Sequence, residues 1–327
     1  MRALITGADG FAGGHLVRYL RAQDPAIALY GTVWRAAPRA DIEEALQDAI
    51  QLDLRDPDAV NAMIREIRPD YVFHLAAQAF VPRSFEDPWE TLENNIRAQL
   101  NLTLALLAHG PEARMLVVSS AEIYGNVGQD QMPMTEELPF APNSPYSVSK
   151  VAQDMLGLQY YLSHNMAIIR VRPFNHIGPG QNARFVAPAF ATQLARIEYG
   201  LQDPVIQVGN LTAARDFTDV RDVAAAYYAA LMRGKPGAAY NVCSGQPYTI
   251  QYLLDTLLRY CRAKVEVKVD PTLLRVVDRP VVVGSAARLN ADTGWVPEIP
   301  FEQSLRDVME EARARVAHEA GLAPATG

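Results

Sequence analysis

Short apolar runs alternate with amphipathic stretches through the first half of this chain, and this rhythm constrains its fold most strongly. The apolar runs have the length of buried strands and lie at residues 2–6, 27–33, 48–52, 71–75, 115–118 and 167–172. The stretches between them carry apolar residues at helical spacing, as at residues 57–67, 88–109 and 145–163. Alternating strands and helices are typical of a parallel sheet wrapped on both faces, so the sequence predicts an α/β fold.

Three glycines stand between the first predicted strand and the first predicted helix. Gly7, Gly10 and Gly13 have the spacing G-x-x-G-x-x-G, and Phe11 begins the amphipathic stretch that follows. Glycine allows a tight turn and a close approach of the backbone to a pyrophosphate, which the amides at a helix start then bind. The strand before and the helix after the motif favour a dinucleotide site in a Rossmann-type doubly wound parallel sheet. A tight turn without a ligand is the alternative interpretation.

The residues after the second strand bear on the choice of cofactor. An acidic residue there would bind the ribose 2′-hydroxyl of NAD, but the sequence reads Thr32-Val-Trp-Arg35. Arg35 could pair with a 2′-phosphate, which favours NADP(H) and leaves NAD(H) possible, whereas a surface arginine is the alternative. Five further residues at the ends of the third and fourth strands are candidates to border the dinucleotide: Asp53, Leu54, Leu75, Ala76 and Ala77.

A tyrosine and a lysine lie four residues apart at the start of a predicted helix. This spacing puts Tyr146 and Lys150 on one helix face, where the lysine ammonium would lower the pKa of the phenol and could bind the nicotinamide ribose. Tyr146 could then exchange a proton with a substrate near neutral pH. Ser120 and Glu122 follow the apolar run 115–118, and a serine hydroxyl there could hold a carbonyl oxygen.

Composition narrows the possible partners and compartment. The chain has 327 residues and a formal net charge of −7, which argues against a nucleic-acid partner because phosphate backbones need clustered Lys and Arg. It has no apolar run of about 18 residues and no secretory signal pattern, so we expect no membrane span. Cys243 and Cys261 lack the spacing of a metal site. We therefore expect a cytoplasmic protein without a metal.

The motifs together resemble the extended short-chain dehydrogenase/reductase family over nearly the whole chain. The resemblance starts from the glycine turn, Ser119-Ser120 and Tyr146-Ser-Val-Ser-Lys150. More discriminating segments lie at Arg172–Gln181, Val208–Asp222, Tyr240–Gly245 and Thr293–Trp295. These segments resemble the GDP-4-keto-6-deoxy-D-mannose reductases, which form GDP-D-rhamnose, and the related GDP-mannose 4,6-dehydratases.

The resemblance implies roles for individual residues. It makes Ser120, Tyr146 and Lys150 the catalytic set. It also implies a GDP-sugar site with Asn175 near the sugar or diphosphate, Phe185 and Val186 near the guanine nucleotide, and Arg215 and Arg275 at the diphosphate. Around Arg275 this chain departs from the common pattern of its relatives, so Arg279 could share or replace that role.

The pattern of the second half suggests a domain division, and the resemblance suggests an oligomer. After residue 173 the strand–helix rhythm gives way to Pro, Gly and Asn, with a helix expected near 186–199. We expect a dinucleotide-binding domain of residues 1–173 plus about 211–243. A smaller, discontinuous C-terminal substrate domain would comprise about 174–210 and 244–327. Relatives commonly pair through two long helices, here near 88–109 and 145–163, so a homodimer is expected.

The catalytic segment favours one reaction over its close alternatives. A reductase needs a hydride donor and a proton donor, whereas a dehydratase also needs a carboxylate to remove the C5 proton. Dehydratases usually carry Thr-Ser-Glu or Thr-Asp-Glu where this chain has Ser120-Ala-Glu122. We therefore predict NAD(P)H-dependent reduction of the C4 keto group of GDP-4-keto-6-deoxy-D-mannose to GDP-D-rhamnose. Glu122 keeps elimination open, unless it is a structural carboxylate. A related epimerase and a non-catalytic dinucleotide-binding module are further alternatives.

Overall fold

The protein divides into two compact units in a computed structural model that describes residues 1–34, 39–273 and 280–322. The first unit spans residues 1–174, 221–242 and 285–296, and the second spans 175–220, 243–284 and 297–327. Two segments belong to a different unit from the one that the sequence suggested for them. Residues 211–220 join the second unit because β9 (Ala214–Asp219) pairs with strands of that unit. Residues 285–296 join the first because α10 (Ala287–Thr293) packs on β10 (Ala239–Val242).

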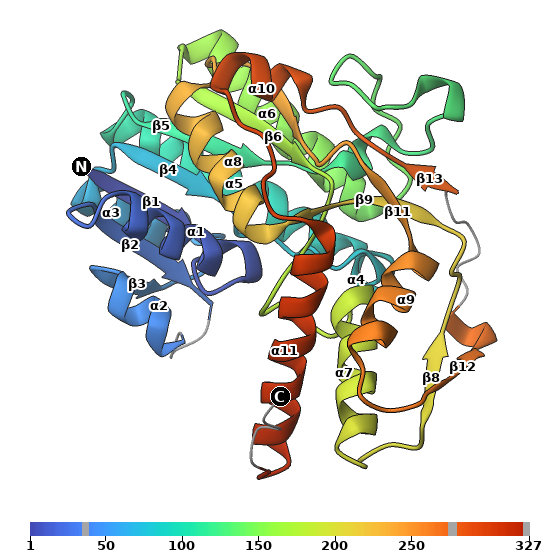
Figure 1. The fold of residues 1–327 in the computed structure, drawn as a ribbon. Helices are drawn as coiled ribbons and strands as arrows, with labels where there is room; N and C mark the ends of the chain where they lie inside the picture. The colour runs from blue at the N-terminus through green and yellow to red at the C-terminus, as the bar shows by residue number, and fades with distance from the viewer. Residues whose placement is uncertain (35–38, 274–279, 323–327) are drawn as a thin grey trace. The chain divides into compact units, whose positions relative to one another are not determined.

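A seven-stranded parallel sheet forms the centre of the first unit, which confirms the predicted fold class (Figure 1). The strand order is β10-β6-β5-β4-β1-β2-β3, and every neighbouring pair is parallel. Besides β10, the strands are β1 (Arg2–Thr6), β2 (Ala28–Val33), β3 (Asp48–Gln51), β4 (Tyr71–His74), β5 (Arg114–Val118) and β6 (Ile168–Pro173). Since β1 lies inside the sheet with β4 on one side and β2 on the other, the chain reverses its winding direction there.

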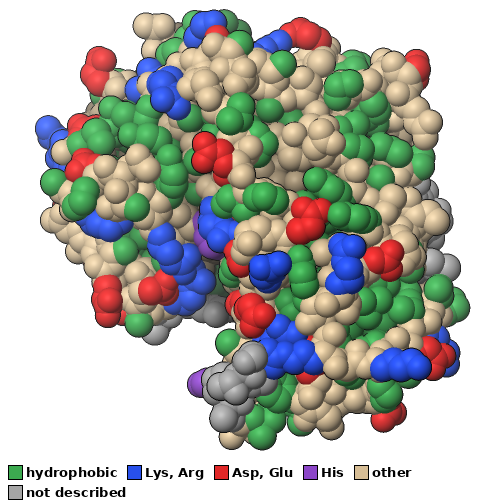
Figure 2. All heavy atoms as spheres, viewed as in Figure 1, with side chains coloured by type: hydrophobic (Ala, Val, Ile, Leu, Met, Phe, Trp, Pro, Cys, Tyr) green, Lys and Arg blue, Asp and Glu red, His purple; other side chains and the backbone are tan. Residues whose placement is uncertain are grey.

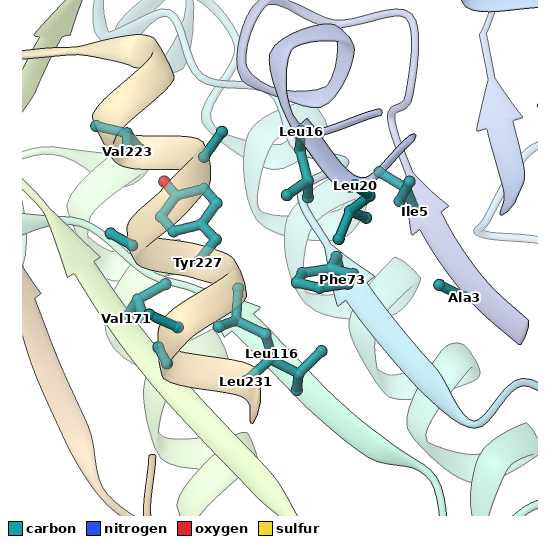
Figure 3. Close-up of a cluster of buried hydrophobic side chains, with 14 of the residues drawn as sticks. Ala3, Ile5, Leu16, Leu20, Phe73, Leu116, Val171, Val223, Tyr227 and Leu231 are labelled. Carbon is teal, nitrogen blue, oxygen red and sulfur yellow. The ribbon is translucent and has the colours of Figure 1, made fainter. Parts of the chain in front are cut away.

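Helices cover both faces of this sheet because successive strand residues point to opposite sides. Ala3 and Ile5 of β1 pack into one buried cluster, and Leu4 between them packs into the other. Figure 3 shows the first cluster, where Leu16 and Leu20 of one helix and Val223, Tyr227 and Leu231 of another meet the strands. Those helices are α1 (Phe11–Gln23) and α8 (Val220–Arg233). The opposite face carries α3 (Pro57–Ile67), α5 (Pro88–His109) and α6 (Pro145–His164).

Short helices complete the first unit around this framework. Two of them, α2 (Ala40–Ala45) and α4 (Val81–Glu86), are α-helical, and two are 3₁₀ turns, η1 (Ala121–Tyr124) and η2 (Gln129–Gln131). The turn η1 matters most for function, because it begins directly after Ser120 at the end of β5. Both long helices α5 and α6 begin with proline at an early position, where the missing N–H costs no hydrogen bond.

The second unit has its own core and its own small sheets. Strand β9 pairs with β7 (Asn175–Ile177), β11 (Pro247–Thr249) and β13 (Val281–Val282), while β8 (Val205–Val208) pairs with β12 (Glu266–Val269). Three helices pack their apolar faces into one cluster: α7 (Val186–Glu198), α9 (Ile250–Tyr260) and α11 (Phe301–Glu319). The turn η3 (Pro271–Leu273) completes the described elements. Asp216 of β9 is fully buried and accepts hydrogen bonds from Ser244, Gly245 and Gly284, so it ties two loops to the sheet.

Charges of both signs are distributed over the protein surface. On the face drawn in Figure 2, Lys and Arg side chains lie interspersed with Asp and Glu. Within residues 1–34, 39–273 and 280–322, no helix combines the length and hydrophobicity that crossing a membrane requires.

Candidate active site

The glycine turn requires residues without a side chain at two positions. Gly7 has a φ of +71°, a left-handed conformation that favours glycine. A Cβ at Gly13 would overlap the carbonyl oxygen of Gly7, so the start of α1 can pack on the turn only without a side chain there. Gly10 is the N-cap residue of α1, and among the described residues no side chain caps it. A helix start without a side-chain cap is a typical place for an anion such as a pyrophosphate.

A cavity of about 320 Å³ opens beside this turn at the carboxyl ends of the strands. Its lining contains five of the predicted cofactor residues: Gly7, Asp53, Leu54, Ala76 and Ala77. Gly10, Phe11 and Gly13 shape the turn and α1 instead, and Leu75 packs against the core. The prediction for Arg35 falls outside the described residues. The glycine turn, the helix start and this cavity together fit a dinucleotide such as NAD(P).

The cavity also contains residues that the sequence analysis missed. Trp34 lines it directly after β2, and Glu90, Asn94 and Ala98 line it from α5. The last three recur every four residues and so share one helix face, a signal that the sequence did contain. Asp53 meets them from the end of β3, and the Arg55 guanidinium holds the pKa of its carboxyl below the ordinary value.

The residues predicted as the catalytic set lie together at the end of β5 and the start of α6. Ser120 is the N-cap of η1, where its hydroxyl accepts a hydrogen bond from the amide of Glu122, and it lies close enough to Tyr146 to affect the pKa of the phenol. The Lys150 Nζ lies 5.9 Å from the centre of the Tyr146 ring and donates a 2.9 Å hydrogen bond to the carbonyl oxygen of Val118. A capping box between Ser144 and Ser147 begins α6, which fixes the turn that carries Tyr146.

Burial sets the protonation states of Tyr146 and Lys150, and the prediction that Lys150 lowers the pKa of Tyr146 is wrong for this structure. Burial raises the pKa of Tyr146 to about 12. The Ser120 hydroxyl opposes this increase, and the charge of Glu122 adds to it. Burial lowers the pKa of Lys150 to about 7. The expected decrease of the Tyr146 pKa by Lys150 is therefore absent, because desolvation of the phenolate dominates. At neutral pH Tyr146 is a neutral phenol, which can donate a proton.

Replacing Lys150 with methionine should remove a pH dependence of stability. Between pH 7 and 10.5 the unfolded chain holds more protons at Lys150 than the folded one, so wild-type stability should rise with pH there. The slope is at most about 1.4 kcal/mol per pH unit. Urea unfolding of wild type and Lys150→Met at pH 7, 8 and 9 measures it. The free energy of unfolding of wild type relative to the variant should increase over this range, and parallel curves would contradict the assigned pKa.

A buried chain of polar side chains connects the glycine turn to α6. The Thr6 hydroxyl accepts hydrogen bonds from the amides of Leu75 and Ala76, so it donates its own proton to Nδ1 of His74 over 2.9 Å. Burial and the charge of Lys150 lower the pKa of His74 to about 3, so the imidazole is neutral. Gln153 of α6 lies 3.4 Å from the other ring nitrogen. The sequence did not reveal this series of buried polar side chains, because its members come from separate segments.

A buried ion-pair network connects α6 to η1. The Asp154 carboxylate, which has no exposed surface, pairs with Arg170 at 2.5 Å and Arg172 at 2.8 Å. Arg172 also donates to the hydroxyl of Tyr124, and that hydroxyl donates to Asn241. Tyr124 ends η1 and Asp154 lies one helical turn after Lys150. The network therefore holds the segment of Ser120 and the helix of Tyr146 in one arrangement.

The remaining predicted residues belong to the second unit. Asn175 is exposed at the start of β7, and Phe185 is 40% exposed as the N-cap residue of α7, which Val186 begins. Arg215 lies on β9 beside the buried Asp216, so its side chain points to the opposite face of that strand. It donates to the carbonyl of Ala214. Arg275 and Arg279 fall outside the described residues.

The first unit alone therefore contains the parts of a carbonyl-reducing centre. Ser120 and Tyr146 offer two hydroxyl groups that can hold one carbonyl oxygen, and Tyr146 can protonate it. NAD(P)H in the adjoining site would supply the hydride. Glu122, partly buried in η1, adds a carboxylate near enough to raise the pKa of Tyr146.

Comparison with known proteins assigns the family. The family model described as GDP-mannose 4,6 dehydratase matches residues 4–308. GDP-6-deoxy-D-mannose reductase of Pseudomonas aeruginosa is 40% identical over 97% of this chain and 99% of that protein. The solved structure of RMD from the same organism, complexed with NADPH, superposes with a TM-score of 0.86 at 40% identity, covering 96% of this chain and 99% of that one. Thermus thermophilus UDP-glucose 4-epimerase in complex with NAD gives a TM-score of 0.84 at 30% identity, with coverage of 96% and 99%. This chain therefore belongs to the GDP-mannose 4,6-dehydratase family of the extended short-chain dehydrogenases/reductases.

Proposed function

We propose that this protein, as an NAD(P)-dependent nucleotide-sugar oxidoreductase, reduces the C4 keto group of GDP-4-keto-6-deoxy-D-mannose to form GDP-D-rhamnose. The observation that carries the proposal is the 40% identity with the Pseudomonas aeruginosa reductase over nearly the full length of both chains. The Ser120-Ala-Glu122 segment supports it, because Ala121 is a buried apolar residue where dehydratases carry a polar one. NADPH is the preferred cofactor in this proposal, through Arg35.

Each catalytic residue has a separate task in this reaction. Bound NAD(P)H would supply the hydride that the C4 carbon of the sugar accepts. Ser120 and Tyr146 hold the carbonyl oxygen, and the phenol transfers its proton to that oxygen as negative charge develops there. Lys150, whose ammonium donates a hydrogen bond to the Val118 carbonyl, would bind the nicotinamide ribose of a bound cofactor and would restore a proton to Tyr146.

A 4,6-dehydratase is the second candidate because a specific residue favours it. Elimination of water from the sugar requires a carboxylate that removes the C5 proton, and Glu122 lies two residues after Ser120 near Tyr146. In the reductase, Glu122 has no proton to remove from the substrate. Glu122→Gln should therefore retain reduction and should abolish dehydration.

One pair of incubations distinguishes the two activities. Purified protein and NADPH are mixed with GDP-4-keto-6-deoxy-D-mannose, and the absorbance at 340 nm and the product mass are followed. A reductase consumes one NADPH for each sugar and adds two hydrogen atoms to the product. With GDP-mannose, a dehydratase forms a product lighter by one water without net NADPH consumption. Loss of water from GDP-mannose without reduction of the keto sugar would overturn the reductase proposal.

Arg215→Ala should weaken binding of the GDP-sugar. A charged hydrogen bond to a diphosphate contributes about 1.5–3 kcal/mol, so the KM for the sugar nucleotide should rise about tenfold or more. The KM for NADPH should not change, because Arg215 belongs to the second unit. The KM of Arg215→Lys for the sugar nucleotide should lie between those of wild type and Arg215→Ala, because lysine keeps the charge but cannot form the bidentate contact. Unchanged sugar-nucleotide kinetics would remove Arg215 from the diphosphate site.

We also propose a homodimer formed through α5 and α6, as in related enzymes. These helices pack against each other and leave Leu104, Val148 and Leu162 exposed at 47%, 44% and 71%. A second copy would remove this apolar surface from water. Sedimentation equilibrium of the purified protein measures its mass, and a monomer at micromolar concentration would contradict the proposal.

A further inference from the structure

Trp34 exposes a large aromatic surface at the edge of the cofactor cavity. It follows β2 directly, its side chain is 68% exposed, and it belongs to the lining of the 320 Å³ cavity. We propose that the Trp34 indole stacks on the adenine ring of the NAD(P) cofactor. The inference rests on the proposed function, because it takes a dinucleotide as the ligand of this cavity. Their position after the third strand led us to expect Asp53 and Leu54 at the border of the dinucleotide, and the sequence indicated no role for Trp34.

Strand order shows which half of the dinucleotide reaches Trp34. The glycine turn follows β1, and it is the place for the pyrophosphate. Tyr146 and Lys150 lie beside β5, on the β4 side of β1. The nicotinamide must lie on that side, where the hydride is used. The adenosine half therefore extends across the ends of β2 and β3, which Trp34 and Asp53 follow. Three strand spacings, about 14 Å, separate β5 from β2.

The chemistry of this end of the cavity suits a purine base. Leu54 and Ala98 are buried residues that present apolar surface to the cavity. Asp53 and Asn94 add polar groups that can bond the edge of a base. An aromatic side chain beside such a wall stacks on a flat ring and stabilises it, whatever the ring substituents. The carbonyl of Trp34 accepts a hydrogen bond from Gln51 of β3, which holds the backbone at this residue.

Binding measurements on two ligands test this placement. The first ligand is NADP⁺. The second is adenosine 2′,5′-bisphosphate, which contains the adenine and no nicotinamide. Calorimetric titration of Trp34→Ala should show that the affinity for both ligands falls by the same factor, about 5- to 150-fold for the loss of one stacked base. Trp34→Phe should restore most of the affinity, because a phenyl ring also stacks.

Indole fluorescence provides a second readout that does not depend on activity. NADP⁺ does not absorb the indole emission, so quenching by it requires close contact. Trp89 is a matched control, because it is 70% exposed and is not in the cavity lining. Wild type and Trp89→Phe should be quenched by NADP⁺ and by adenosine 2′,5′-bisphosphate, and Trp34→Phe should not. Nicotinamide mononucleotide should leave the emission unchanged.

The outcomes separate this inference from the proposed function. Wild-type affinity in Trp34→Ala, or undiminished quenching in Trp34→Phe, would overturn the stacking of Trp34 and leave the dinucleotide site in place. A wild-type protein that binds neither NADP⁺ nor NAD⁺ would overturn both the cofactor proposal and this inference. If Trp89→Phe lost quenching to the same extent as Trp34→Phe, the ligand would lie at the start of α5. That result would also overturn the stacking of Trp34 on the adenine.

Discussion

Tyr146→Phe should reduce kcat by about 10²–10⁴-fold, the usual contribution of a positioned proton donor. The variant loses one hydroxyl of a buried side chain and keeps the aromatic ring beside Lys150. Binding of NADPH, measured by calorimetry, should not change, because the cavity lining at the glycine turn does not include Tyr146. The loss therefore concerns the chemical step alone.

A tyrosine on the same helix offers a matched control. Tyr161 lies near the end of α6, far along the helix from Tyr146, and Tyr161→Phe should retain wild-type turnover. Because the pKa of Tyr146 is raised to about 12, wild-type activity should not fall between pH 7 and 9 through ionisation of this phenol. Wild-type turnover in Tyr146→Phe would refute the proton-transfer role and with it the proposed mechanism.

Asp154→Asn should lower the free energy of unfolding by about 3–5 kcal/mol, the cost of removing one member of a buried ion pair. The carboxylate faces two guanidinium groups, Arg170 and Arg172, whose side chains are also buried. An amide of the same shape leaves both positive charges without a counter-ion in a medium of low polarity. Urea unfolding followed by circular dichroism measures the change.

An exposed ion pair provides the comparison for Asp154. Glu93 and Arg97 lie one turn apart on α5 at 2.9 Å, with the Arg97 side chain 51% exposed. Glu93→Gln should cost no more than about 0.5 kcal/mol, since water screens such pairs. If Asp154→Asn unfolds at the same urea concentration as wild type, Arg170 and Arg172 do not depend on this carboxylate and the proposed positioning of η1 fails.

Local patterns were sufficient to predict the framework of the first unit. Residues 57–67 and 88–109 form helices with the predicted bounds, because their apolar residues recur at helical spacing and Pro57 and Pro88 begin them. The glycine turn could also be predicted, since its backbone conformation depends on residues adjacent in the chain. Tyr146 and Lys150 were found for the same reason, through a four-residue spacing on one helix.

The missed features depend on residues that are distant in the sequence. Residues 211–220 belong to the second unit because of strand pairing, and residues 285–296 belong to the first because α10 packs on β10. No local pattern encodes either contact. The pKa of Tyr146 was mispredicted because spacing revealed the lysine nearby and did not reveal the burial of both groups.

By itself, the sequence determined the alternation of strands and helices, the glycine turn and the tyrosine–lysine pair, because each follows from backbone preference and spacing within a few residues. Only the tertiary structure decided which side chains share a site. Trp34 and Asp53 follow the carboxyl ends of β2 and β3, and Asn94 lines the same cavity from the first turns of α5. Asp154 meets Arg172 because α6 packs against β6. The tertiary structure also decides the pKa values of buried groups, because desolvation depends on all the atoms packed around a group.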